Sequence, residues 1–424
     1  MGFEQGLSGL EASTQNLAVI GNNVANSSTV GFKSSEVLFS DVYANSLQGS
    51  GASQVGIGVQ VASVEQQFTQ GTITSSDNPL DIAINGGGFY QMSNNGTITY
   101  SRNGQFQLDK NGYIVNASGD ILQGYPANAA GVLQTGSTAN LQINTANIAP
   151  SATSKVAAVL NLDAKDASPG PVGGPIPAFN ATDPTTYNNS SSVTIYDSLG
   201  NSHVLQTYYV QTGDTGGAGA NEATWEVYAT VDGTQVPGPN ADGSYGPLTF
   251  ASNGSIDSTA TTLPIPISAT LTNGATSPLT FNLDFTGTTQ YGAAFAATTL
   301  TQDGYTSGQL SGFSASADGT IVGSYTNGQS ATLGQIALAN FTDPNGLQSL
   351  GNNQWAASAT SGAALVGVPG TGQLGVLQSS ATEDSNVDLT QQLVNMITAQ
   401  EAYQANSQTI KTEDTLLQTL VTLR

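Results

Sequence analysis

A regular helical repeat runs through about the last forty residues of the chain. Its positions alternate four and three residues apart, and they are Leu389, Leu393, Met396, Gln400, Tyr403, Ser407, Ile410, Asp414, Leu417 and Val421. A 3.5-residue period is typical of coiled coils, and the pattern contains neither Pro nor Gly. Ser385 to Asp388 fits a capping box at its start. The C-terminus is therefore predicted to be one long helix that packs against other helices.

This helix carries a second apolar row, and the N-terminus carries a shorter stripe. The second row is Val387, Val394, Ile397, Leu416, Leu420 and Leu423, so the C-terminal helix needs more than one partner. The N-terminal stripe is Leu7, Leu10, Leu17, Ile20 and Val24, with the three-, four- or seven-residue spacing of an amphipathic helix.

Two interpretations of the helical ends remain open. The helices could pair within the chain as an ordinary stalk, or they could also pack against other copies. Roughly 20 N-terminal residues cannot cover a C-terminal helix nearly twice as long, which favours some contact between copies. The candidate assembly residues are Leu7, Leu10, Leu17, Ile20, Val24, Leu389, Leu393, Met396, Tyr403, Ile410, Leu417 and Val421.

The chain between these helices has the pattern of β-structure. Eight Asn-Gly and four Asp-Gly pairs, the strongest short signal for hairpins, lie among segments of alternating apolar and polar residues such as Val204–Val210 and Trp225–Val231. The predicted fold class is therefore mainly β with α-helical termini. We expect antiparallel β-domains nested on a coiled-coil pair formed by the N- and C-terminal helices.

The nesting predicts discontinuous domains. Residues 1–30 and 380–424 form the helical domain, and the Ser- and Gly-rich residues 31–71 form a linker. Residues 72–146 and 298–379 form a first β-domain, and residues 147–297 form an outer β-domain inserted into it. A Pro-rich loop near Pro169–Pro177 marks an edge of the outer domain.

Charge is scarce and strongly acidic. The chain has 7 Lys and Arg against 29 Asp and Glu, 8% charged residues with a net charge of −22, where soluble domains carry roughly 25%. Nucleic acid is excluded as a main partner, because too few cations are present to neutralise phosphates. The chain also contains no apolar run long enough for membrane insertion.

Candidate chemical sites are few. The chain has no Cys and a single His, His203, which we expect on a surface turn. Asp-Gly turns could bind calcium and paired carboxylates could hydrolyse glycosides, but neither a calcium-loop motif nor an aromatic-rich sugar cleft accompanies them. The sequence therefore predicts no catalytic, cofactor-binding or metal-binding residues.

The amino-acid sequence at both ends of the chain closely resembles the termini of bacterial flagellar rod and hook proteins. The matching runs are SGLEASTQNLAVIGNNVANSSTVGFKSSEVLFSDVY from Ser8 and SNVDLTQQLVNMITAQEAYQANSQTIKTEDTLLQTLVTLR from Ser385. The run TYSRNGQFQLDKNGYIVNASGDILQGYP from Thr99 is similar to the family's first β-domain, and VTIYDSLGNSHVLQTYYV to the outer domain of hook subunits. Glu401 departs from the basic residue that the family often has there.

This resemblance implies a structural, non-enzymatic subunit of the flagellar hook, a flexible helical tube outside the cell that transmits torque from rod to filament. It implies self-assembly through channel-lining terminal helices and export through the flagellar type III apparatus without a cleaved signal peptide. Implied partners are other copies, the rod protein, the hook cap, the hook-filament junction protein and the export apparatus. A distal rod component of the same family is one alternative, and an acidic secreted β-rich adhesin or surface-layer protein is another.

Overall fold

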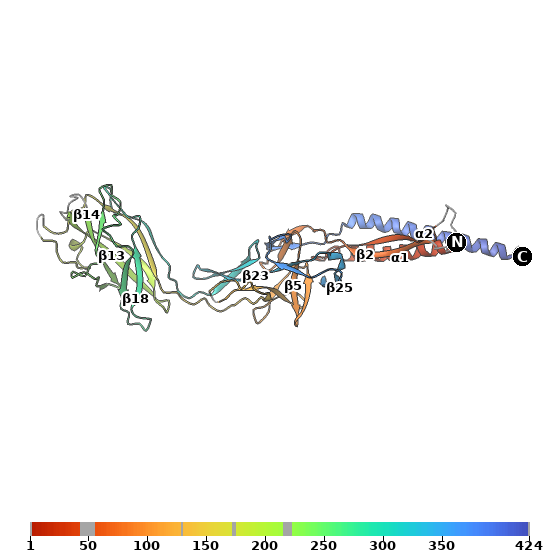
Figure 1. Ribbon diagram of the computed structural model, residues 1–424, viewed down its shortest axis with the longest axis horizontal. Coiled ribbons are helices and arrows are strands. Elements are labelled where there is room, and N and C mark those ends of the chain that lie inside the picture. The colour runs from red at the N-terminus through yellow and green to blue at the C-terminus, as the bar shows by residue number, and fades with distance from the viewer. Residues whose placement is uncertain (1, 43–55, 129, 172–174, 215–222, 423–424) are drawn as a thin grey trace. The chain divides into compact units, whose positions relative to one another are not determined.

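The structure is a computed structural model that describes residues 2–42, 56–128, 130–171, 175–214 and 223–422. It is mainly β with one helix at each end (Figure 1). The chain divides into two compact units. The terminal unit contains residues 1–145, 311–324 and 330–424, and the inserted unit contains residues 146–310 and 325–329.

The inserted unit extends further than the outer β-domain expected from the sequence, which ended at residue 297. Strand β20 (Ala296–Gln302) pairs with β11 (Lys155–Asp163), so this returning strand completes a sheet of the inserted unit. Isolated bridges then join Ser151 to Tyr305 and Ile148 to Gly308. Backbone pairing therefore keeps the returning chain in this unit beyond residue 297.

The terminal unit begins and ends with a helix. Its elements are α1 (Gly2–Ala25), β1 (Ser35–Val42), β2 (Gly58–Gln66), β3 (Ile73–Ser75), β4 (Ile82–Asn85), β5 (Phe89–Asn94), β6 (Thr97–Ser101), β7 (Gln107–Leu108), β8 (Ile114–Val115), β9 (Ile121–Pro126), β10 (Ala139–Asn140), β21 (Leu310–Ala315), β22 (Thr320–Tyr325), β23 (Ser330–Ile336), β24 (Leu338–Asn340), β25 (Gln348–Gly351), β26 (Gln354–Ala356), β27 (Leu365–Gly367), β28 (Val376–Ser379), β29 (Ala381–Glu383) and α2 (Leu389–Thr422).

A 13-stranded sheet forms most of the β-structure of this unit, with the order β21-β22-β23-β9-β5-β6-β26-β25 along its main path. Strands from both passes of the chain alternate in it, since β9, β5 and β6 lie between β23 and β26. Strands of this sheet contribute to an aromatic cluster of Phe89, Tyr100, Phe341 and Trp355, whose rings pack edge to face with one another and with Phe68. This interleaving explains how two distant segments form one domain.

The expected linker at residues 31–71 is instead partly a two-stranded ribbon. Strands β1 and β2 pair antiparallel from Ser35–Gln66 to Val42–Gly58, with a bulge after Leu38. Residues 43–55 lie outside the described residues. The Ser- and Gln-rich composition concealed the strands, in which Val37 alone is buried.

The inserted unit contains two five-stranded sheets. One has the order β17-β18-β11-β19, with β20 also paired to β11, and the other has the order β12-β13-β14-β15, with β16 also paired to β14. The strands not yet given are β12 (Asn189–Tyr196), β13 (Ser202–Asp214), β14 (Ala223–Val231), β15 (Thr234–Val236), β16 (Pro247–Phe250), β17 (Ile265–Ala269), β18 (Leu279–Asp284) and β19 (Thr289–Tyr291).

Alternating apolar residues form the core of this unit. Strand β11 buries every second residue from Val156 to Leu162, and β14 contributes Trp225, Val227 and Ala229 to the same cluster. One sheet departs locally from the antiparallel expectation, because β11 pairs parallel with β18 and β19. No crossover helix is needed, since the chain reaches β18 by way of the other sheet.

Several predicted turns form tight hairpins. Asn95 and Gly96 join β5 to β6 and both have positive φ, as do Asp232 and Gly233 between β14 and β15. Positive φ at both central residues is the type I′ geometry that favours Asn-Gly and Asp-Gly. Asn345-Gly346 instead lies in a short 3-10 helix at Pro344–Gly346.

Candidate assembly surface

The two terminal helices pack antiparallel through small residues. Gly6 faces Ile410 and Gly9 faces Asn406, so closely that a Cβ atom added at Gly6 would lie 2.9 Å from Ile410 Cγ1. At Gly9 the corresponding distance to Asn406 Nδ2 is 2.7 Å. Further along the pair, Ile20 and Ala399 are buried. Because protein interiors are close-packed, glycine at these two positions sets the separation of the helices.

Asn23 joins this helix pair to the ribbon. Its side chain is 1% exposed, donates from Nδ2 to Ser35 O at 2.8 Å, and accepts at Oδ1 from Ser35 N at 2.9 Å. The same Nδ2 lies 3.4 Å from Gln392 Oε1 on α2. One buried amide therefore connects α1, β1 and α2, and a buried Asn can fix the register of a helix pair.

The ribbon also contacts the first turns of α1. Gln5 Nε2 donates to Gly56 O at 2.6 Å, and Ser8 Oγ accepts from Val59 N at 3.3 Å. Gly58 is required here, because an added Cβ would lie 2.2 Å from Ser8 Oγ. The helix thus packs on α2 with one face and on the ribbon with another.

The structure separates the candidate assembly residues into three groups. Ile20 is buried between the elements, whereas Leu10, Leu17, Val24, Met396 and Ile410 are half-buried at the edges of the helix pair. The remaining side chains are exposed: Leu7, Leu389, Leu393, Tyr403, Leu417 and Val421. The helix pair itself depends on Gly6, Gly9 and Asn406 more than on the apolar stripe, so much apolar surface of α2 is left uncovered.

More apolar side chains on α2 are exposed by roughly half or more of their surface. They include Val394 at 53%, Ile397 at 57% and Leu416 at 55%. Burying the exposed half of such a side chain contributes about 1 kcal/mol. Several exposed apolar side chains on one helix indicate an interaction surface.

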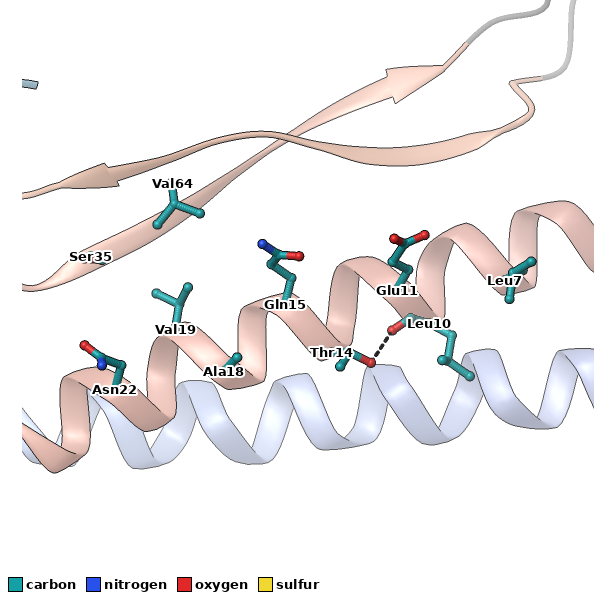
Figure 2. Close-up of a pocket in the computed structure, with 10 residues that line it drawn as sticks. All are labelled: Leu7, Leu10, Glu11, Thr14, Gln15, Ala18, Val19, Asn22, Ser35 and Val64. Carbon is teal, nitrogen blue, oxygen red and sulfur yellow. Dashed lines mark hydrogen bonds between the residues drawn. The ribbon is translucent and has the colours of Figure 1, made fainter. Parts of the chain in front are cut away.

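A groove runs along α1 beside the ribbon (Figure 2). Its volume is about 820 Å³, and it is lined by Leu7, Leu10, Glu11, Thr14, Gln15, Ala18, Val19, Asn22, Ser35 and Val64. In Figure 2, Val64 of the ribbon lies across from Val19 and Gln15 of α1. Glu11 is the one ionisable residue among these lining residues.

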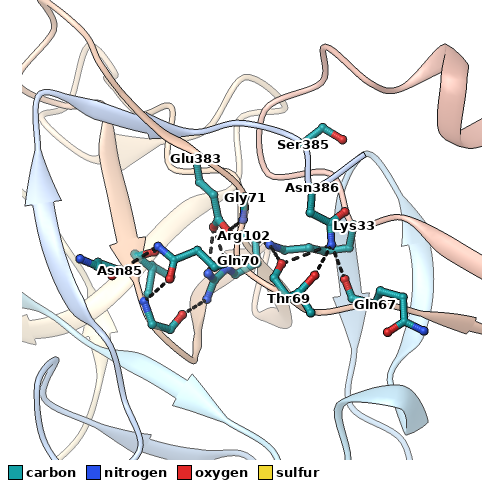
Figure 3. A network of polar contacts seen from close by, with 12 residues as sticks. Lys33, Gln67, Thr69, Gln70, Gly71, Asn85, Arg102, Glu383, Ser385 and Asn386 are labelled. Atoms are coloured by element: carbon teal, nitrogen blue, oxygen red, sulfur yellow. Dashed lines mark hydrogen bonds and ion pairs between the residues drawn. The ribbon is translucent and has the colours of Figure 1, made fainter. Parts of the chain in front are cut away.

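A buried ion cluster lies where the chain passes between the helices and the β-sheet (Figure 3). Glu383 Oε1 accepts from Lys33 Nζ at 2.7 Å and from Gly71 N at 3.0 Å. Glu383 Oε2 accepts from Arg102 Nε and also lies 2.9 Å from a terminal guanidinium nitrogen of Arg102. The side chains of Lys33, Glu383 and Arg102 are 0%, 1% and 4% exposed.

Backbone carbonyls complete the cluster. Lys33 Nζ donates to Thr69 O at 2.8 Å, and Arg102 donates from one terminal nitrogen to Gly86 O at 2.9 Å and Gly88 O at 2.7 Å. Burial and the nearby Arg102 charge lower the pKa of Lys33 from its ordinary 10.5, although Glu383 opposes this shift. Sequence reasoning missed these three residues, although two of the chain's seven basic side chains lie here.

Asn386, immediately before α2, forms hydrogen bonds to two earlier segments of the chain. Its Oδ1 accepts from Ser34 N at 2.7 Å, and its Nδ2 donates to Gln67 O at 2.6 Å. The helix cap itself is Asp388, whose Oδ1 accepts from Thr390 N and Gln391 N at 2.9 and 3.1 Å. The predicted capping box was therefore misplaced, because Ser385 Oγ accepts from Val387 N, before the helix begins, and Asn386 bonds to residues 34 and 67 rather than to the first turn.

His203 lies in the inserted unit and is not on the surface. It is 8% exposed at the start of β13, with Nδ1 2.6 Å from Asp232 Oδ2 and Nε2 3.2 Å from Asp197 Oδ2. Asn273 Nδ2 donates to the same Asp197 oxygen at 2.6 Å. The expectation of an exposed turn was wrong because three turns converge on this imidazole.

Within the described residues, no group of three or more His, Asp and Glu side chains is arranged to hold a metal ion. None of the helices in the described part of the chain is both long and apolar enough to cross a membrane.

Family models match four segments of the chain. Residues 3–33 match the flagella basal body rod protein model, and residues 83–157 match the flagellar hook protein FlgE/F/G D1 domain. Residues 161–305 match the flagellar basal body protein FlaE D2 domain, and residues 378–423 match the flagellar basal body rod FlgEFG protein C-terminal model.

Relatives match over the whole length. The chain is 42% identical to the flagellar hook protein FlgE of Escherichia coli strain K12 over 440 residues, covering 100% of both chains. It is 42% identical to that of Salmonella typhimurium strain LT2, again covering 100% of both chains. It is 32% identical to that of Borreliella burgdorferi, covering 99% of this chain and 98% of the relative.

A solved structure shares the fold. The crystal structure of Helicobacter pylori flagellar hook protein FlgE2 superposes with a TM-score of 0.52 at 15% identity, covering 73% of this chain and 99% of that one. The full-length identity, together with helical ends around nested β-structure, is decisive: the chain belongs to the flagellar hook protein FlgE family.

Proposed function

We propose that this hook protein polymerises through a surface made of α1, α2 and the β1–β2 ribbon. The observation that carries the proposal is the uncovered apolar surface of α2, including Leu393, Ile397 and Leu417. Such a surface is unfavourable on an isolated subunit and is stabilised when neighbouring copies cover it. The partner in the tube wall is therefore another copy of the same chain.

The remaining partners follow from the position of a hook between rod and filament. We propose that the first copies contact the rod protein, that a hook cap guides addition at the growing end, and that a hook-filament junction protein follows the last copies. Export through the flagellar type III apparatus precedes assembly. The role in this proposal is structural, and we assign no catalytic residue.

Deletion of residues 389–424 tests the proposed surface. It removes α2 and leaves Glu383 and Asn386 in place, so the buried ion cluster around Glu383 keeps all its residues. We expect a soluble protein with cooperative unfolding of its β-structure that forms no tubes in negative-stain electron microscopy at concentrations where the full chain does. Tubes formed by the truncated protein would contradict the proposal.

The rod alternative is separated by a cellular experiment. Cells that lack the whole protein should retain rods and lack hooks when their flagellar bases are viewed by electron microscopy. Loss of the rod itself would favour the alternative.

A further inference from the structure

An uncharged apolar surface lies on the β-structure of the terminal unit, where β27 leads through a short loop into β28. Residues 365–376 form this surface and are called the β27–β28 segment. Leu365 is 62% exposed, Val366 is 38% exposed and Val376 is 41% exposed. All three lie within residues 344–382, the longest stretch of the sequence that contains no Asp, Glu, Lys, Arg or His.

Three consecutive glycines, Gly86 to Gly88, support this segment from behind. A Cβ atom added at Gly86 would lie 2.9 Å from Gly375 Cα, and one added at Gly87 would lie 3.0 Å from Gln373 O. Gly375 N also donates to Gly87 O at 2.7 Å. Arg102 of the buried ion cluster donates to Gly86 O at 2.9 Å. The segment therefore packs closely on a part of the chain that the ion cluster holds in place.

Backbone hydrogen bonds close the loop between the two strands. Gly370 N donates to Gly375 O at 2.9 Å, and Leu374 N donates to Thr371 O at 3.0 Å. Pro369 packs on the preceding turn, because a Cβ atom added at Gly319 would lie 2.9 Å from Pro369 Cγ. A loop that is already ordered loses little conformational entropy when another molecule covers it.

Strand β27 also presents an open edge. It pairs with β24 from Leu338–Gly367 to Asn340–Leu365 and, among the described strands, with no second neighbour. Soluble proteins usually block such edges with charged side chains, Lys above all. Strand β27 and the loop after it contain none, so this edge carries no charge that would prevent another molecule from approaching.

The charge of the whole chain indicates what covers this surface. With a net charge of −22, two copies repel each other wherever their acidic surfaces meet. Contact between copies is therefore least costly where the surface is uncharged, and the centres of protein interfaces are depleted of charged residues. A basic partner would form no ion pair with residues 365–376. These observations favour a second copy of this chain over a partner of opposite charge.

We propose that the β27–β28 segment is a contact between neighbouring copies, in which a second copy covers Leu365, Val366 and Val376. This inference rests on the proposed function, and it adds a contact on the β-structure to the helical surface described above. The residues of the terminal unit outside the described part of the chain are 1, 43–55, 129 and 423–424. In sequence they adjoin α1, the ribbon, the turn after β9 and α2, and none of them adjoins β27 or β28.

Photo-cross-linking tests which molecule covers the segment. Leu365 is replaced by p-benzoylphenylalanine in the full chain, tubes are assembled and irradiated, and the products are separated by denaturing electrophoresis and mapped by mass spectrometry. We expect a product with the mass of two chains, at several times its level in dilute unassembled protein. Tubes of normal yield that give only products within single chains, joined to residues 43–55 or to the inserted unit, overturn this contact and leave the proposed function intact.

Charge substitutions give a second measurement. We expect Leu365→Asp to keep the unfolding midpoint of the β-structure and to lose at least ten-fold in tube yield, whereas Leu365→Met keeps most of it. Leu199→Asp is the matched control for the added charge, because Leu199 is 58% exposed and lies in the inserted unit.

The control should also keep most of the tube yield. Equal yields for Leu365→Asp and Leu199→Asp would overturn the proposed contact. Failure of the unsubstituted chain to form tubes overturns the proposed function and this contact with it.

Discussion

Glu383 is a single buried carboxylate that accepts hydrogen bonds from Lys33, Arg102 and the Gly71 amide. Substitution by Gln keeps the shape but leaves two buried cations without a counter-charge. Breaking a buried pair in this way typically costs about 3 to 5 kcal/mol. We therefore expect Glu383→Gln to lower the free energy of unfolding of the terminal unit by that order, as measured by urea denaturation.

A matched control for this substitution is the exposed pair between Lys155 and Asp284. These groups are 3.4 Å apart, and the Lys155 side chain is 60% exposed. Solvent screening limits such pairs to about 0 to 1 kcal/mol, so Lys155→Gln should change stability very little. Equal changes in the free energy of unfolding for the two substitutions would show that the cluster at Glu383 does not stabilise the terminal unit.

His203 links the stability of the inserted unit to pH. Burial opposes protonation, but hydrogen bonds to Asp232 and Asp197 outweigh it and raise the pKa of His203 above its ordinary 6.5. A raised folded-state pKa stabilises the fold fully below about pH 6.5 and loses this contribution as pH rises through the folded value. Asp197 has a lowered pKa, so its own contribution is lost only at acidic pH, below its ordinary 3.8.

We therefore expect the inserted unit to unfold more easily at pH 9 than at pH 6, and His203→Gln to remove most of that difference. Fluorescence of the buried Trp225 reports this unit when Trp355, in the terminal unit, is replaced by Phe. A pH profile that is unchanged by His203→Gln would assign the effect to other groups.

At the level of secondary-structure elements, the helix pair depends on two glycines that a hydrophobic pattern does not reveal. Gly6 and Gly21 both lie in α1, but an added Cβ at Gly21 meets nothing within 4 Å. Ala is favoured over Gly in a helix by about 1 kcal/mol, which applies to both positions. At Gly6 the methyl group must displace Ile410, and such overpacking costs about 1 to 3 kcal/mol.

Gly6→Ala should therefore lower the temperature at which assembled tubes dissociate, whereas Gly21→Ala should raise it or leave it unchanged. Light scattering during heating measures both. A higher dissociation temperature for Gly6→Ala would mean that the helices can separate without loss of contact between copies.

The same elements show where sequence reasoning succeeds and where it stops. The 3.5-residue period predicted α2, and the Asn-Gly and Asp-Gly pairs predicted hairpins such as the one at Asn95 and Gly96, because both signals are local. The face that α1 presents to α2 is a tertiary property. It depends on how closely two backbones approach, and Gly6 and Gly9 carry no apolar signal that marks them.

At the scale of the whole molecule, the nested order of the β-domains was predictable from the helical ends. If the N- and C-terminal helices pair, the β-domains must lie between them in the sequence, so the chain leaves and returns through the same place. The exact limit of the inserted unit was not, because β20 is stabilised by its partner β11, about 140 residues away in sequence. The cluster of Lys33, Arg102 and Glu383 was equally hidden, since its members lie in three distant segments.

The scarcity of charged residues affects how copies of the chain can contact one another. Ser, Thr, Asn and Gln side chains hydrogen-bond to each other or to water with small net differences in free energy. Neighbouring copies with such surfaces can exchange contacts at low cost. We expect a tube built from such surfaces to bend while it turns, because few ion pairs between copies would have to break.

Two segments of chain beside Glu383 also determine how the subunit responds to twist. One segment follows α1 and contains Lys33, and the other precedes α2 and contains Glu383. The ion pair between these two residues holds the segments side by side. Rotation of the β-sheet is therefore delivered to both helices at once through a pair of covalent connections. Because the ion cluster holds the two connections together, we expect both helices to rotate together when the tube turns.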